Sequence, residues 1–185
     1  MTLVIAWLIC FSSFWLCILS LATKLLKMEG KSSYFQTLRI IHGALLMGTI
    51  LFLALVRFVF LHESEIDAAS VDDPLLFALP VGLLAIGVFG GWWFFNNTLK
   101  VARQAPNLTQ KLTHYQGGLI IRWASLEAPI LFATIWFMLY ADKSFMAIAL
   151  VGMALLAFAR PRPDAAARDL QLSDEDKQTI SEHGF

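Results

Sequence analysis

Residues Gly117 to Tyr140 read GGLIIRWASLEAPILFATIWFMLY, with Arg122 and Glu127 as their only charged side chains. A helix needs about 20 mostly apolar residues to cross the hydrocarbon core of a bilayer. This stretch is long enough and apolar enough to do so. It therefore predicts a transmembrane helix that carries an acidic residue near its middle.

The composition of the whole chain favours the same class of protein. Of its 185 residues, 58% are hydrophobic and 15% are charged, whereas soluble domains average about 45–50% apolar and about 25% charged residues. A soluble fold of this size cannot bury such an apolar excess. The composition excludes a soluble globular domain and a disordered chain. The net charge of zero indicates no nucleic-acid partner.

Four other apolar stretches accompany the one that ends at Tyr140. The last of them is short, so it either crosses or lies tilted and half-buried. We expect an all-α integral membrane bundle of five transmembrane helices, or of four, that forms one domain over residues 1–160. Residues 161–185 are expected to form a cytoplasmic tail with a short helix from Ser173 to Glu182. The predicted spans cover residues 2–23, 40–61, 74–95, 117–140 and 145–159.

Charge alternates between the segments that join these stretches. The segments after the first and third spans are basic, and the tail begins with three arginines, at 160, 162 and 168. The segment after the second span is acidic, with carboxylates from Glu63 to Asp73. Because Lys and Arg mark the cytoplasmic side of a membrane protein, we expect the N-terminus outside and the C-terminus in the cytoplasm.

Glu127 is the candidate functional residue. It lies about ten residues, or roughly 15 Å, above the cytoplasmic end of its predicted helix, close to the middle of the bilayer. A carboxylate at that depth costs several kcal/mol unless it is protonated, paired or hydrated. Glu127 therefore either binds an ion or serves as structural glue, as a protonated acid that hydrogen-bonds to a neighbouring helix.

Several residues could support Glu127. Pro129 removes a backbone donor and predicts a kink near Arg122–Glu127, which leaves a carbonyl free to share a proton, an ion or a water. Arg122 either extends to the cytoplasmic headgroups or pairs with another helix. His42 is interpreted as a neutral interfacial histidine, with a proton relay as the alternative. Small and hydroxyl residues of three other predicted helices share the depth of the acid: Ser12, Ser13, Thr49, Gly87, Gly90 and Gly91.

The sequence contains no pattern that predicts an enzyme. It has no nucleophile elbow, phosphate-binding loop, metal-binding His pair or dinucleotide fingerprint. Cys10 and Cys17 have no His or further Cys near them to complete a metal set, and they are interpreted as packing residues. We expect no catalytic residues, no metal site and no cofactor.

Part of the chain resembles the helical hairpin of the proteolipid ring subunit of rotary ATPases. The resemblance rests on Val101-Ala102-Arg103-Gln104-Ala105-Pro106, on Lys111 and on Leu126-Glu127-Ala128. That family has a Gly-rich helix, a cytoplasmic loop of the type Ala-Arg-Gln-Pro, and a second helix whose mid-membrane Glu carries the translocated proton or sodium ion. The resemblance covers about a third of the chain and implies an ion-binding role for Glu127.

Two departures limit what this resemblance implies. The loop carries an extra Ala105, and the Gly-rich helix runs into Trp92-Trp93-Phe94-Phe95, rings too large for the inner wall of a rotor. The region from the third span to the tail also resembles small uncharacterised membrane proteins of Bacteroidetes-type bacteria. That second resemblance implies a multi-pass protein of the bacterial cytoplasmic (inner) membrane, and it implies no activity.

Three functions agree with the sequence. We prefer a non-enzymatic accessory or scaffold subunit of a larger bacterial membrane complex, because the chain has almost no soluble mass and its aromatic-rich helices offer lateral surface. The alternative is a proteolipid-like protein that handles protons or sodium through Glu127. A small transporter is the weakest of the three, because no inverted repeat is evident. The expected partners are the lipid bilayer and other membrane subunits, or further copies of this chain.

Overall fold

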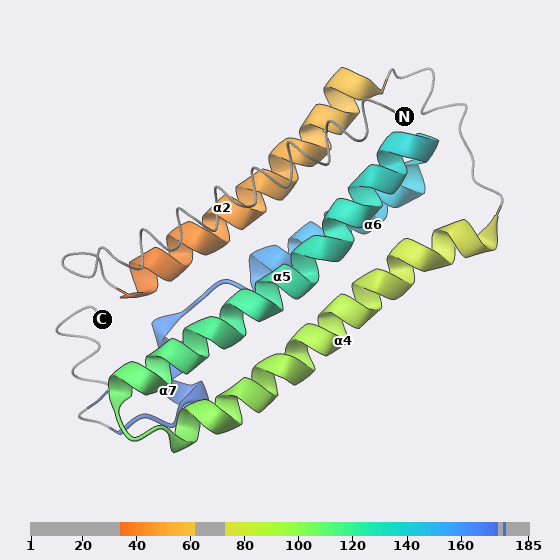
Figure 1. Cartoon of the computed structure of the whole chain (residues 1–185). Coiled ribbons are helices and arrows are strands. Elements are labelled where there is room, and N and C mark those ends of the chain that lie inside the picture. Colours follow the sequence, from red (N-terminus) through yellow and green to blue (C-terminus); the bar gives the residue numbers. More distant parts are fainter. Residues whose placement is uncertain (1–33, 62–72, 174–175, 177–185) are drawn as a thin grey trace.

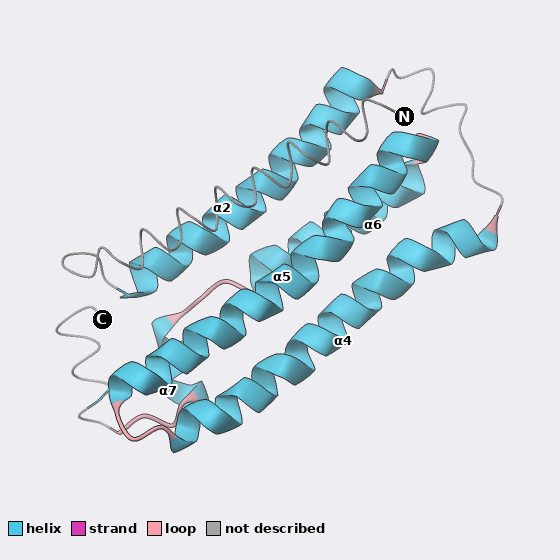
Figure 2. Cartoon of the chain, in the orientation of Figure 1, coloured by secondary structure: helices cyan, strands magenta, loops and turns pink. Residues whose placement is uncertain are grey.

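The computed structural model describes residues 34–61, 73–173 and 176, and every regular element in them is a helix (Figures 1 and 2). The first predicted span, residues 2–23, and with it Ser12 and Ser13, lies outside the described residues. The helices are α2 (Tyr34–Leu55), the π-helix η1 (Val56–Phe60) that continues it, α4 (Pro74–Gln104), α5 (Leu108–Tyr140), α6 (Lys143–Phe158) and α7 (Pro163–Asp169).

Three helical stretches of the described residues are long and apolar enough to cross a membrane. They are Tyr34–Phe60, α4 and α5, with 27, 31 and 33 residues. The fourth apolar helix, α6, has 16 residues and reaches that length only together with α7, from which it is bent by 76°. The described chain is therefore an all-α protein with three such spans, or four if the bent pair is counted as one.

Polar side chains cap the N-termini of three of these helices, α4, α5 and α6. The carboxylate of Asp73 accepts a hydrogen bond from the backbone N–H of Leu75, and Pro74 occupies the first turn, where its missing N–H is harmless. The side chain of Asn107 caps α5 in the same way, and that of Asp142 caps α6. Between α5 and α6, Ala141 has a φ of 53°, the left-handed conformation that ends many helices.

The central helix of the bundle is α5. In its most apolar window 56% of the residues are buried, against 28% for Tyr34–Phe60 and 17% for α4. Short connections make α4 and α6 antiparallel to α5. The α2 helix runs in the same direction as α5, because the Tyr34 hydroxyl near its start donates to the carbonyl oxygen of Leu112, at 2.6 Å. Figure 1 shows α5 between α2 and α4, with α6 behind it.

Glycines set the closest approach of α4 to α5. A Cβ on Gly87 would overlap the carbonyl oxygen of Ser125 and lie 2.9 Å from Cγ of Pro129. One turn later, a Cβ on Gly91 would lie 3.1 Å from Cβ of Ser125. Two small residues four apart let the helix backbones meet, as in membrane helix pairs generally.

The sequence of the charged tail does not indicate the helix α7. This helix folds back beneath the ends of α4 and α5. Three tail side chains are buried there: Ala166, Leu170 and Leu172. The Arg103 side chain donates from Nε to the carbonyl oxygen of Asp169 at 2.6 Å. Of the predicted helix from Ser173 to Glu182, the structure describes only Ser173 and Asp176. The backbone N–H of Asp176 donates to Oγ of Ser173.

Candidate functional site

Glu127 lies inside the bundle, midway along α5. Its side chain is 5% exposed, and its Oε2 atom has no hydrogen-bond partner in the described part of the chain. A buried polar atom left unpaired costs about 1–3 kcal/mol, so nearly all such atoms in proteins are paired. An unpaired oxygen on a buried carboxyl group is therefore the feature of this helix that most needs explanation.

Pro129, two residues after Glu127, removes one backbone hydrogen bond from α5 without ending the helix. Pro129 cannot donate to the carbonyl oxygen of Ser125, the residue four positions before it, yet α5 continues as one helix to Tyr140. The freed carbonyl faces Gly87 of α4. Glu127 follows Ser125 by two residues and so projects about 200° around the helix from it. The proline and the acid share a depth but not a face.

Helical spacing instead puts Glu127 on the same side of α5 as Trp123, which contacts α2. One turn before it, Trp123 is fully buried, and its ring centroid lies 5.0 Å from that of His42 on α2. Because α2 and α5 run in the same direction, one further turn brings Leu46 of α2 to the level of Glu127. Side chains of an α-helix lean toward its N-terminus, so the Glu127 side chain leans back toward the level of His42.

His42 shares the burial of Glu127. Its side chain is 6% exposed, and its Nδ1 atom also has no hydrogen-bond partner among the described residues. The indole that it contacts is held in place, because Nε1 of Trp123 donates to the carbonyl oxygen of Ala159 at 2.8 Å. Of the three buried side-chain atoms without a partner in the described ranges, two belong to this α2–α5 seam and the third is Nε1 of Trp136.

Thr49 lies on the same face of α2, two turns after His42. It is 1% exposed, and its hydroxyl donates to the carbonyl oxygen of Leu46 at 2.8 Å. This bond leaves the oxygen free to accept a proton donor or to face a cation. His42, Glu127 and Thr49 thus place an imidazole, a carboxyl group and a hydroxyl along one buried seam.

The other predicted supporting residues lie elsewhere. The guanidinium of Arg122 is 5.4 Å from the ring centroid of Phe95 on α4, a cation–π distance that turns the charge away from the seam. Gly91 packs on α5, whereas Gly90 is exposed, with no atom within 4 Å of a Cβ placed on it. The small residues that share the depth of Glu127 are therefore divided between an α4–α5 contact and the outer surface.

The seam can exchange a proton or hold a single cation weakly. A carboxyl group and an imidazole are the two side chains most used for proton exchange near neutral pH. No group of three or more His, Cys, Asp or Glu side chains comes together in the part of the chain that the structure describes.

Sequence reasoning identified His42 but did not place it with Glu127. A signal was present, because His42, Leu45, Thr49 and Phe52 follow the 3.6-residue period and so form one face of α2. That face carries both polar residues of the helix interior. What the sequence does not show is which other helix the face contacts, because apolar residues occupy every side of α2.

Comparison of the chain with family models, with curated proteins and with solved structures finds no match.

Proposed function

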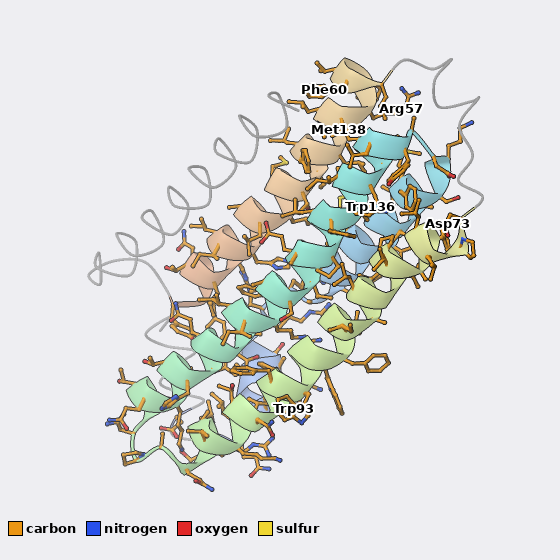
Figure 3. The ribbon with its side chains drawn as sticks, turned by 45° about the vertical axis from the view of Figure 1, so that its right-hand side comes forward. Arg57, Phe60, Asp73, Trp93, Trp136 and Met138 are labelled. Atoms are coloured by element: carbon orange, nitrogen blue, oxygen red, sulfur yellow. The ribbon has the colours of Figure 1, made fainter. Side chains whose placement is uncertain are left out.

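We propose that this chain is a non-enzymatic multi-pass membrane protein that acts as an accessory subunit of a larger membrane complex. The observation that carries the proposal is the outer face of α4, which we define by Ile86, Phe89 and Trp93. These side chains are 69%, 70% and 63% exposed. At positions i, i+3 and i+7 they lie on one side of the helix, and Figure 3 shows Trp93 projecting away from the bundle.

A lateral partner would account for this face better than lipid alone. Aromatic rings are enriched in the buried centres of protein interfaces, and lipid tails solvate Leu as well as they solvate Phe. On its opposite side α4 packs closely on α5 through Gly87 and Gly91, so the helix is firmly attached while its aromatic face stays uncovered. A subunit of this shape can add one helix to a neighbouring membrane protein.

The test is native mass spectrometry of the tagged full chain after gentle extraction from its own membrane. We expect it to co-purify at a fixed ratio with larger, different subunits. A Phe89→Leu/Trp93→Leu variant should lose this association, because it keeps the apolar character and removes the rings. The control is Phe158→Leu, at a residue of α6 that is 85% exposed. A chain that is always recovered alone, or only with copies of itself, would contradict the proposal.

The α2–α5 seam favours a second function, the handling of protons or sodium ions. The observation behind it is the buried carboxyl group of Glu127, one turn after the Trp123 ring that contacts His42. Among the described residues, neither Oε2 of Glu127 nor Nδ1 of His42 has a hydrogen-bond partner. Glu127→Gln keeps the size and the hydrogen-bonding capacity of the side chain and removes its titration. The protein would then fold and assemble normally, but it would not exchange the ion.

This second function is tested in vesicles that contain the purified chain. We expect pH-dependent ion flux and carbodiimide labelling in the wild type, and neither in Glu127→Gln. Asp164→Asn, a change at an exposed carboxylate of α7, is the control and should keep both. Normal flux in Glu127→Gln would end the ion hypothesis and leave the accessory function standing.

A further inference from the structure

The middle stretches of the described apolar helices contain two ionisable side chains, and both adjoin the same aromatic ring. The His42 ring on α2 lies 5.0 Å from that of Trp123, between centroids, and Glu127 follows Trp123 by four residues on the same side of α5. No other ionisable side chain occurs in the middle stretches, which are residues 40–56, 74–99, 123–139 and 144–158. Two residues far apart in the sequence thus bring an imidazole and a carboxyl group to one place in the bundle.

Each of the two groups has an atom that is open to a proton. Oε2 of Glu127 and Nδ1 of His42 are buried and have no hydrogen-bond partner among the described residues, in side chains that are 5% and 6% exposed. Carboxyl and imidazole groups are those most used to exchange protons near neutral pH. Neither of these two atoms has to give up a hydrogen bond within the described bundle before it can do so.

The nitrogen atom makes this pair better suited to a proton than to a sodium ion. Hard cations take oxygen ligands, whereas an imidazole nitrogen binds softer metals and accepts protons. Of the two ions that a buried carboxyl group could handle, His42 beside Glu127 therefore favours the proton.

His42 lies nearer than Glu127 to one end of the bundle, the end at which α2 and α5 both begin. Its ring contact makes it level with Trp123, which precedes Glu127 by one turn, about 6 Å along the helix axis. At this end α2 begins at Tyr34 and α5 begins at Leu108. A proton that travels between this end and Glu127 therefore passes the level of His42.

The charged groups nearest to the pair along the two helices are directed elsewhere. The guanidinium of Arg122, on α5, lies 5.4 Å from the ring centroid of Phe95 on α4, and Arg39, on α2, is exposed. After α6, the chain contributes a backbone carbonyl, that of Ala159, which accepts a hydrogen bond from the Trp123 indole. The imidazole and the carboxyl group are thus the titratable pair of the described seam.

We propose that His42 is the proton relay of the Glu127 site, and that one water molecule entering between them carries the proton. This inference rests on the ion-handling function proposed above, which it narrows to protons. Oε2 of Glu127 gives its proton to the water, and the water gives one of its own protons to Nδ1 of His42. A neutral carboxyl group and a neutral imidazole become a carboxylate and an imidazolium, so the net charge of the seam stays zero.

The test measures how fast the Glu127 carboxyl proton exchanges for deuterium, by infrared spectroscopy of the full chain in phosphatidylcholine vesicles. The carboxyl band that disappears in Glu127→Gln identifies the residue. We expect rapid exchange in the wild type and exchange about a hundredfold slower in His42→Gln, the usual effect of losing a proton-transfer group. His114→Gln, at an exposed position of α5, is the control and should exchange as the wild type does.

Carbodiimide labelling of Glu127 distinguishes the two ions and verifies that the variant folds. The reagent attacks the protonated carboxyl group, and a sodium ion bound there would protect it. We expect the wild type and His42→Gln to be labelled alike, with no protection by a large excess of sodium chloride.

Three results would overturn the proposal. The first is equal exchange in the wild type and in His42→Gln. The second is protection of Glu127 by sodium, which would leave the ion-handling function in place with a different ion. The third is slow exchange in a Ser12→Ala/Ser13→Ala variant together with fast exchange in His42→Gln, which would assign the relay to the first predicted span, outside the described residues. A wild type whose exchange depends on His42 but that conducts no ions would instead confirm the relay and reject the ion-handling function.

Discussion

At the scale of single residues, the Thr49 hydroxyl of the α2–α5 seam is hydrogen-bonded, whereas the imidazole and the carboxyl group each keep an unpaired atom among the described residues. Glu127 and His42 are 5% and 6% exposed, yet each keeps an atom without a partner in the described part of the chain. Such atoms reduce stability, since burial removes their bonds to water without replacement. A protein keeps them when their chemistry is used or when an ion or a water completes them.

This cost predicts the effect of replacing the acid by an apolar residue of similar size. Glu127→Leu removes the unpaired oxygen and should raise the free energy of unfolding by about 1–3 kcal/mol. Glu127→Gln should change it less, because the amide is still polar. Thermal unfolding in detergent measures both variants. A lower melting temperature for Glu127→Leu would show that the carboxyl group has a stabilising partner.

The same substitution should have opposite effects at two glycines of α4, Gly87 and Gly90. Gly87→Ala places a Cβ against the Ser125 carbonyl oxygen and Cγ of Pro129, so the helices must separate, at a cost of about 1–3 kcal/mol. Gly90→Ala meets no atom within 4 Å and should stabilise the helix by about 0.5–1 kcal/mol. Unfolding of the two variants under identical conditions is the measurement. Equal effects would mean that α4 does not approach α5 through Gly87.

At the scale of helices, long apolar stretches can be predicted from the sequence and their contacts cannot. The predicted spans 40–61, 74–95 and 117–140 all lie within or along observed helices, but α4 and α5 run on as far as Gln104 and back to Leu108. These added turns carry Lys100, Arg103 and Lys111. A span predicted from hydropathy ends at such charges. The helices nevertheless include these residues, because backbone hydrogen bonds and the cap at Asn107 do not depend on hydropathy.

The same reasoning explains what the sequence could show of the candidate site. The depth of Glu127 follows from counting residues, because the rise of a helix is fixed. Its facing partner does not, since which sides of two helices meet depends on all their contacts together. Gly87, Gly90 and Gly91 have the same depth, yet only the first and last contact α5. Helix faces had to come from the structure.

The short helix α7 leads to a prediction about the tail. Leu170 is 1% exposed, and an aspartate in its place would bury an unpaired charge, which costs several kcal/mol. Leu170→Asp should therefore release α7 and raise the rate of tryptic cleavage after Arg168 about tenfold or more. Gln171→Asp adds the same charge at the exposed neighbouring position and serves as the control. Equal cleavage of the two variants would show that α7 is not docked.

At the scale of the whole molecule, charge separates the two ends of the bundle. The α4–α5 loop and α7 lie at one end (Figure 1), together with Lys100, Arg103, Lys111 and the arginines that follow α6. The segment between η1 and α4 joins the other ends of its helices and is acidic in sequence. Basic residues are retained on the cytoplasmic side during insertion. The fold thus gathers the basic residues of separate segments at one end of the bundle, where together they favour one orientation in the membrane.

This separation predicts the orientation of the chain in the membrane. In a chain whose Cys10 and Cys17 are replaced by serine, we expect an impermeant maleimide to label Ser64→Cys in intact cells. Ser181→Cys should be labelled only after the membrane is opened. The reverse labelling would contradict the predicted topology.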